Sequence, residues 1–129
     1  MTLLIWCLFI TMLLPILSKM PVAYAQQQLG KYDNHNPRAQ QATLSGFGAR
    51  ALAAHQNSFE SLLFITPAIL LALITNHTSP FIEQMAMLHV AARLCFHCFY
   101  LLNWSTLRSI VWFIGVSTPF IIVIQCLPG

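Results

Sequence analysis

Three long hydrophobic stretches of this chain carry ionisable residues where a membrane helix tolerates them poorly. Arg50 and Glu60 lie on one stretch, Arg93 lies on a second, and Arg108 lies near the start of a third. A charged side chain near hydrocarbon costs at least about 2.5–3.5 kcal/mol on insertion scales, so such groups usually face a protein interior or a water-filled cavity. The pattern therefore predicts a polar cavity inside a membrane protein.

The composition supports a membrane protein, because 57% of the residues are hydrophobic and only 7% are charged. A soluble surface normally needs far more charge. Each membrane helix needs about 20 residues to cross a hydrocarbon layer of about 30 Å, so the 129 residues leave room for about four spans. We predict an all-α, multi-pass integral membrane four-helix bundle that occupies residues 1–129 as one domain, with spans at about 2–20, 47–75, 81–102 and 107–127.

The first apolar run has an alternative interpretation as a secretory signal peptide. Ala23-Tyr24-Ala25 followed by Gln26 resembles a signal-peptidase site. However, no Lys or Arg precedes the run, and the run is longer than the roughly 7–15 apolar residues that are usual in a signal peptide. We therefore expect a retained span, followed by a polar loop over residues 29–45 that is rich in turn-forming residues.

The positions of the basic residues predict the orientation of the chain. They cluster around the first and third loops, while the second loop has none. Because basic residues favour the cytoplasmic side, both termini are expected outside and the polar residues in the cytoplasmic half of the membrane. The basic residues that carry this argument are Lys19, Lys31, Arg38, Arg50 and Arg108.

Helical spacing sorts the polar residues into stripes, because positions three, four and seven apart share a helix face. We expect the stripes to meet at one depth of the membrane. They are formed by Arg50, Asn57 and Glu60 or Ser61; by Arg93, His97 and Tyr100; and by Arg108 and Trp112 with Ser109 alongside.

Most of these residues also have a purely structural interpretation. Arginine and tyrosine can anchor helix ends at an interface, and buried polar groups can hold helices together. Arg93 is different, because it lies about 12 residues, or about 18 Å, into its stretch and is too deep to reach water easily. We expect it to pair with Glu60 or with a ligand carboxylate.

Three separate motifs resemble one known family. The segment from Arg50 to Glu60, with the sequence RALAAHQNSFE, is similar to the second-helix signature of the membrane-associated proteins in eicosanoid and glutathione metabolism, the MAPEG family. Ala92-Arg93, Tyr100 and Arg108-Ser109 resemble the pattern that follows in that family. The segment from Tyr32 to Arg38 resembles a subgroup of bacterial members, which implies a bacterial inner membrane.

The resemblance implies a homotrimer among membrane lipids, with glutathione as co-substrate between neighbouring subunits near the cytoplasmic side. A hydrophobic small molecule would be the second substrate. Arg108 would lie near the sulfur of glutathione and Ser109 could donate a second hydrogen bond to it, which makes these two the predicted catalytic residues. The predicted glutathione-binding residues are Arg38, Arg50, Asn57, Glu60, Arg93, Tyr100 and Trp112.

The chain departs from better-known members at two positions of the second helix. Ala53 and Gln56 stand where those members carry basic residues, so fewer cations remain for the two carboxylates of glutathione. We predict a glutathione-dependent transferase or peroxidase acting on hydrophobic electrophiles. The alternatives are a non-catalytic lipid-binding membrane protein of the same fold, and a small structural membrane protein whose polar residues only hold a trimer together.

The cysteines of the third stretch do not predict a metal site. Cys95 and Cys98 flank Phe96-His97 in the middle of the stretch, without the second pair of ligands that a zinc site needs. The sequence predicts neither a bound metal nor a nucleic-acid partner.

Overall fold

The computed structural model describes residues 1–128, and over this range the chain forms helices and no strands. The predicted all-α class is confirmed. Four helices are long and one is short. They are α1 (Thr2–Gln28), α2 (Pro37–Gln41), α3 (Gly46–Ile74), α4 (Pro80–Leu101) and α5 (Ser105–Cys126).

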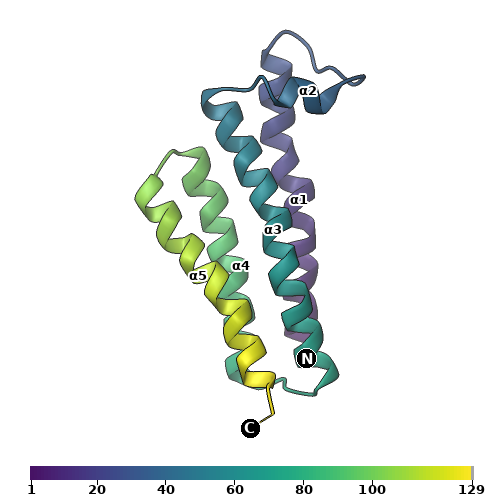
Figure 1. Ribbon diagram of the computed structural model, residues 1–129, viewed down its shortest axis with the longest axis vertical. Coiled ribbons are helices and arrows are strands. Elements are labelled where there is room, and N and C mark those ends of the chain that lie inside the picture. Colours follow the sequence, from purple (N-terminus) through teal and green to yellow (C-terminus); the bar gives the residue numbers. More distant parts are fainter. Residues whose placement is uncertain (129) are drawn as a thin grey trace.

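The four long helices run side by side, and α3 packs against α1, α4 and α5 (Figure 1). Helices α4 and α5 form a tight hairpin. The connection that contains α2 lies at one end of the molecule, and both termini lie at the opposite end. Helices α1 and α3 extend past the turn of the α4–α5 hairpin at the α2 end.

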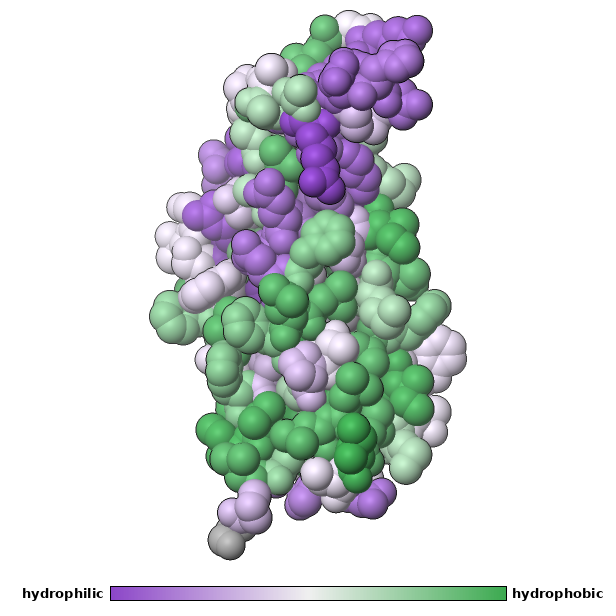
Figure 2. Space-filling view, turned by 45° about the vertical axis from the view of Figure 1, so that its right-hand side comes forward, coloured by the Kyte–Doolittle hydropathy of each residue, from purple (hydrophilic) through white to green (hydrophobic). Residues whose placement is uncertain are grey.

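Three of the long helices, α1, α3 and α5, are long and apolar enough to cross a membrane. Helix α4 has a similar length, but it lacks the necessary hydropathy because Glu83, His89, Arg93 and His97 dilute its apolar residues. Figure 2 shows hydrophobic side chains over the half of the molecule that holds the termini, and hydrophilic side chains toward the α2 end. Such a broad apolar surface suits contact with lipid rather than water.

Buried aliphatic side chains fill the space between the helices in the apolar half. Ile65 and Ile69 of α3 pack with Leu4, Ile82 and Ile122 from the other three long helices. Buried alanines lie between them and let the helix backbones approach closely. These are Ala68, Ala72 and Ala86.

The two short turns are fixed by asparagines in the left-handed conformation. Asn76 (φ 58°) follows α3, and Asn103 (φ 61°) follows α4. Asparagine tolerates this conformation better than most residues, and it lets the last carbonyls of a helix accept backbone hydrogen bonds. His77 N–H donates to the carbonyl of Ala72, and Trp104 N–H donates to the carbonyl of Phe99.

Two features differ from the sequence-based expectations. Helix α1 continues to Gln28 instead of ending near residue 20, so its last turns lie at the polar end of the molecule. The expected loop 29–45 contains α2, which begins at Pro37. The fixed φ of proline suits the first position of a helix, and the side chains of Gln26 and Gln40 bond this connection to α1. The other three helices begin and end within two residues of the expected limits.

Candidate functional site

A polar cavity of about 390 Å³ lies between α3, α4 and α5 toward the α2 end. Six of the nine predicted site residues line it, although they come from three helices. Ala53, Gln56 and Phe96 complete the lining. The six predicted residues are Asn57, Glu60, Tyr100, Arg108, Ser109 and Trp112.

A buried arginine lies below this cavity and is connected to it by an amide. Arg93 is only 2% exposed, and its Nη1 donates to Asn57 Oδ1 over 3.0 Å. Asn57 Nδ2 in turn donates to Glu60 Oε2 over 3.2 Å. Asn57 therefore bridges the cation of Arg93 and the carboxylate of Glu60, which form no direct ion pair. The other expected partner of Arg93, a ligand carboxylate, stays a prediction.

Arg108 and Tyr100 lie together on the α4–α5 side of the cavity. The guanidinium carbon of Arg108 is 4.4 Å from the centre of the Tyr100 ring, within the range of a cation–π interaction. Ser109 is exposed, and its hydroxyl donates to the Ser105 carbonyl over 3.0 Å. To donate to a sulfur atom, as the sequence predicts, this hydroxyl must first leave its own helix backbone.

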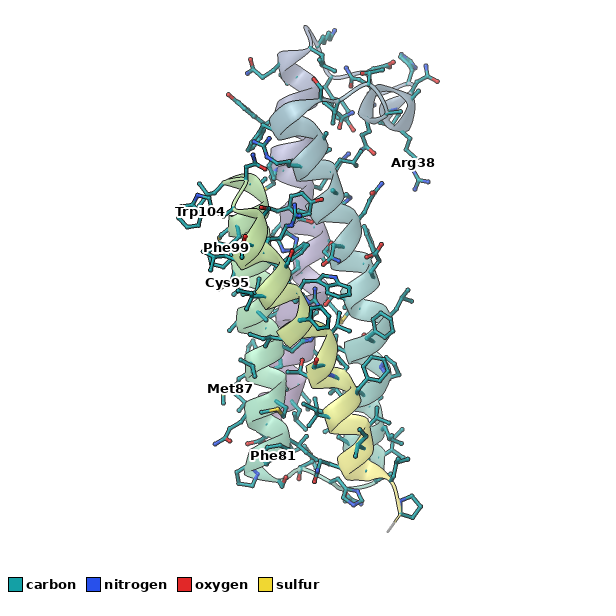
Figure 3. The ribbon with its side chains drawn as sticks, turned by 60° about the vertical axis from the view of Figure 1, so that its left-hand side comes forward. Arg38, Phe81, Met87, Cys95, Phe99 and Trp104 are labelled. Carbon is teal, nitrogen blue, oxygen red and sulfur yellow. The ribbon has the colours of Figure 1, made fainter. Side chains whose placement is uncertain are left out.

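The structure does not bring Arg38 and Arg50 into this cavity. Arg38 extends from α2 away from the α4–α5 hairpin (Figure 3). It lines a second cavity of about 440 Å³ together with His55 and Phe59 of α3. Arg50 is half-buried on α3, lines neither cavity, and its Nε has no hydrogen-bond partner in residues 1–128. Gln56 lines both cavities, so they open on neighbouring faces of α3.

Two positions noted in the sequence for lacking a basic side chain, Ala53 and Gln56, do line the cavity. Arg108 is consequently the only guanidinium among the described residues of its lining, with Arg93 beneath. The cavity still combines one carboxylate, two amides, a guanidinium, a phenol and an indole. Such a set of side chains can bind the ammonium and acidic groups of a small zwitterionic molecule, with an apolar molecule bound beside it.

Sequence reasoning missed several residues that shape this site. Phe96 packs beside Arg93, with 5.9 Å between the ring centre and the guanidinium carbon. His89 is fully buried one turn along α4 from Arg93, and Gly115 of α5 lies against the guanidinium. The spacing of four residues between His89 and Arg93 was the one available signal, because it puts both on one helix face.

No cluster of three or more His, Cys, Asp or Glu residues within residues 1–128 could hold a metal ion. Cys95 and Cys98 are free and exposed on α4. Figure 3 shows Cys95, Phe99 and Trp104 on the outward side of the hairpin.

The helices and the cavity together describe an all-helical membrane protein with a polar site lined by three of its helices. A model of the MAPEG family matches residues 3–128, which is nearly the whole chain. The chain belongs to the MAPEG family, an integral membrane family associated with glutathione use and eicosanoid metabolism. Comparison with curated proteins and with solved structures finds no significant match.

Proposed function

We propose that this protein is a membrane-embedded, glutathione-dependent transferase or peroxidase that acts on hydrophobic electrophiles. The observation that carries the proposal is the cavity between α3, α4 and α5, which combines Glu60, Asn57 and Arg108 in about 390 Å³. This volume lies within the usual range of small-molecule sites, about 300–1,000 Å³.

The two charged groups of the cavity, Glu60 and Arg108, each have a partner on glutathione. Glu60 binds the ammonium group, while Asn57 keeps the carboxylate of Glu60 in place. Arg108 lies close to the sulfur and favours the thiolate, because a free thiol with a pKa of about 8.5 is mostly protonated at neutral pH. A permanently charged guanidinium with several donors suits this role. Tyr100 supports Arg108 through its ring.

The chemistry follows from the thiolate. In a transfer, the thiol proton passes to water, the sulfur forms a bond to an electrophilic carbon, and the leaving group departs with the bonding electron pair. In a peroxidase reaction, two glutathione molecules are oxidised to one disulfide while a lipid hydroperoxide is reduced to an alcohol and water. A hydrophobic electrophile reaches the cavity from the bilayer, past Trp112, which is 38% exposed.

The separation of Arg38 from the cavity supports a site shared between subunits. Within one chain, Arg38 lines a different cavity from Glu60 and Arg108. We propose a homotrimer in which glutathione lies between two copies, with α2 of one copy facing the α3–α5 cavity of the next. Arg38 then supplies the cation that Ala53 and Gln56 do not.

We further propose that α4 is the fourth membrane span. It packs along α3 and α5, and its buried Arg93 faces these helices instead of lipid. Because basic residues favour the cytoplasmic side, we also propose that the α2 end faces the cytoplasm and that both termini lie outside. The membrane that we propose is a bacterial inner membrane.

A second candidate function is non-catalytic lipid binding. A groove of about 400 Å³ between α1 and α3 favours it, because most of its lining is apolar. The lining residues are Met12, Pro15, Ile16, Lys19, His55, Phe59 and Leu62.

Titration of the purified protein in detergent with glutathione separates these functions. The enzyme is expected to bind glutathione and to produce the ultraviolet absorbance of a thiolate, and Arg108→Ala is expected to abolish that absorbance. Ser117→Ala is the matched control, because Ser117 is exposed on the same helix and bonds only to its own backbone. S-methylglutathione should bind without the absorbance change. Binding of lipid alone would support the second function, and glutathione turnover unaffected by Arg108→Ala would refute the proposed one.

A further inference from the structure

We propose that Gly115 is a positioning residue for the cavity. Because Gly115 has no side chain, the Arg93 guanidinium can lie against it. Arg93 then donates a hydrogen bond to Asn57, and Asn57 donates one to Glu60. The effect on glutathione rests on the proposed function, whereas the coupling between Gly115 and Arg93 does not.

The space above Gly115 is filled by the guanidinium. A Cβ atom at this position would lie 2.7 Å from Cζ, Nε and Nη2 of Arg93, closer than real Cβ atoms approach other atoms. The guanidinium is the end of a flexible side chain and can move away. However, moving it breaks the bond to Asn57, which is the one hydrogen bond its nitrogens make in residues 1–128.

The backbone at Gly115 cannot easily move instead. The carbonyl of Gly115 accepts a hydrogen bond from His89 Nδ1 over 2.8 Å, and His89 Nε2 accepts one from the Ser61 hydroxyl over 2.8 Å. A carbonyl only accepts, so Nδ1 carries the proton in this arrangement. Thr118 Oγ1 lies 3.1 Å from the same nitrogen. All of these groups are buried, and together they join α3, α4 and α5 directly below the cavity.

This layer of bonds also determines where the cavity residues of α5 lie. Arg108 precedes Gly115 by seven residues, or about two helical turns on the same face. Asn57 precedes Ser61 on α3 by four residues, or about one turn. With α5 fixed at Gly115 and α3 fixed at Ser61, the position of Arg108 relative to Glu60 is set by the layer below them.

A simpler explanation is that Gly115 only lets two helices approach closely, as small residues often do in membrane proteins. The two explanations differ in whether the effect of Gly115 depends on Arg93. If Gly115 acts by leaving room for the guanidinium, replacing glycine at this position should have little effect once Arg93 has been removed.

A double-mutant cycle with Gly115→Ala and Arg93→Leu tests this dependence. The full chain is purified in detergent, and its thermal midpoint and glutathione affinity are measured. We expect Gly115→Ala to weaken glutathione binding about tenfold in the wild-type background and by less than about twofold in the Arg93→Leu background. In the second background the new methyl fills the space that the guanidinium leaves, so the thermal midpoint should hold or rise. Ser117→Ala is the control for substitution on α5.

Equal losses in both backgrounds would overturn the inference, because a simple packing role predicts them. If Gly115→Ala does not fold, recovery of folding by the added Arg93→Leu supports the inference and continued failure refutes it. If the wild-type chain does not bind glutathione, the proposed function fails, while the thermal midpoints still decide whether Gly115 and Arg93 are coupled.

Discussion

Replacing Asn57 by alanine should destabilise the protein through Arg93 rather than through Glu60. The Asn57 amide accepts from the guanidinium of Arg93, which is 2% exposed, and donates to Glu60, which is exposed. A hydrogen bond to a charged group contributes about 1.5–3 kcal/mol, and a buried donor left without a partner loses its hydration as well. Exposed polar pairs contribute no more than about 1 kcal/mol.

We therefore expect Asn57→Ala to lower the free energy of unfolding by about 1.5–3 kcal/mol. The matched control is Glu60→Gln, which keeps the size of the side chain and an acceptor oxygen, and should change that free energy by less than about 0.5 kcal/mol. Denaturant unfolding in mixed micelles measures both values. Glutathione titration of the same samples should show weaker binding for both variants, because both disturb the carboxylate.

The pair of results separates the two roles of the site. Loss of both stability and binding in Asn57→Ala, with loss of binding alone in Glu60→Gln, fits the relay from Arg93 to Glu60. An Asn57→Ala protein as stable as the wild type would refute the reasoning, because the buried guanidinium would then have no need of the amide.

Two further outcomes follow from the structure. If each site uses Arg38 of one copy and Glu60 of the next, co-expression of Arg38→Ala with Glu60→Gln should restore part of the activity that each variant lacks alone. Turnover by the mixed oligomers measures this recovery, and no recovery would argue for sites within single chains. Ser61→Ala leaves Nε2 of the buried His89 without a hydrogen-bond partner, so it should lower the free energy of unfolding by about 1–3 kcal/mol. Unchanged unfolding of Ser61→Ala would mean that this bond adds nothing to the packing of α3 against α4.

The sequence was sufficient to predict the helices and much of the cavity. Hydrophobic length and turn residues such as Asn76 and Asn103 limit where helices can end, and helical spacing puts Asn57 with Glu60, and Arg108 with Trp112, on shared faces. Those residues do line one cavity. These features depend on local periodicity, which a single sequence contains.

Features that depend on contacts between helices were not predictable in the same way. Spacing by seven puts Arg50 on the face of Asn57, but Arg50 is about 10 Å further along α3, at the end that extends past the α4–α5 turn. The common membrane depth expected for the polar stripes predicts that Arg93 lies near Glu60, but it does not reveal that Asn57 bridges them. The short helix α2 has no apolar period, and its position depends on bonds from Gln26 and Gln40.

The role of Gly115 had no signal in the sequence either. A glycine within an apolar helix usually indicates close packing of helices. The structure shows that the space beside the Cα atom of Gly115 is occupied by the Arg93 guanidinium rather than by the backbone of a neighbouring helix.

Photocrosslinking tests most directly whether glutathione binds in the cavity between α3, α4 and α5. A glutathione carrying a photoreactive group on its sulfur is irradiated with the protein in lipid nanodiscs, and the labelled residues are identified by mass spectrometry. We expect labels on Phe96, Tyr100 and Trp112, and their loss when free glutathione is added in excess. Labels confined to the outward side of α4, around Cys95 and Phe99, and unaffected by glutathione, would contradict the account.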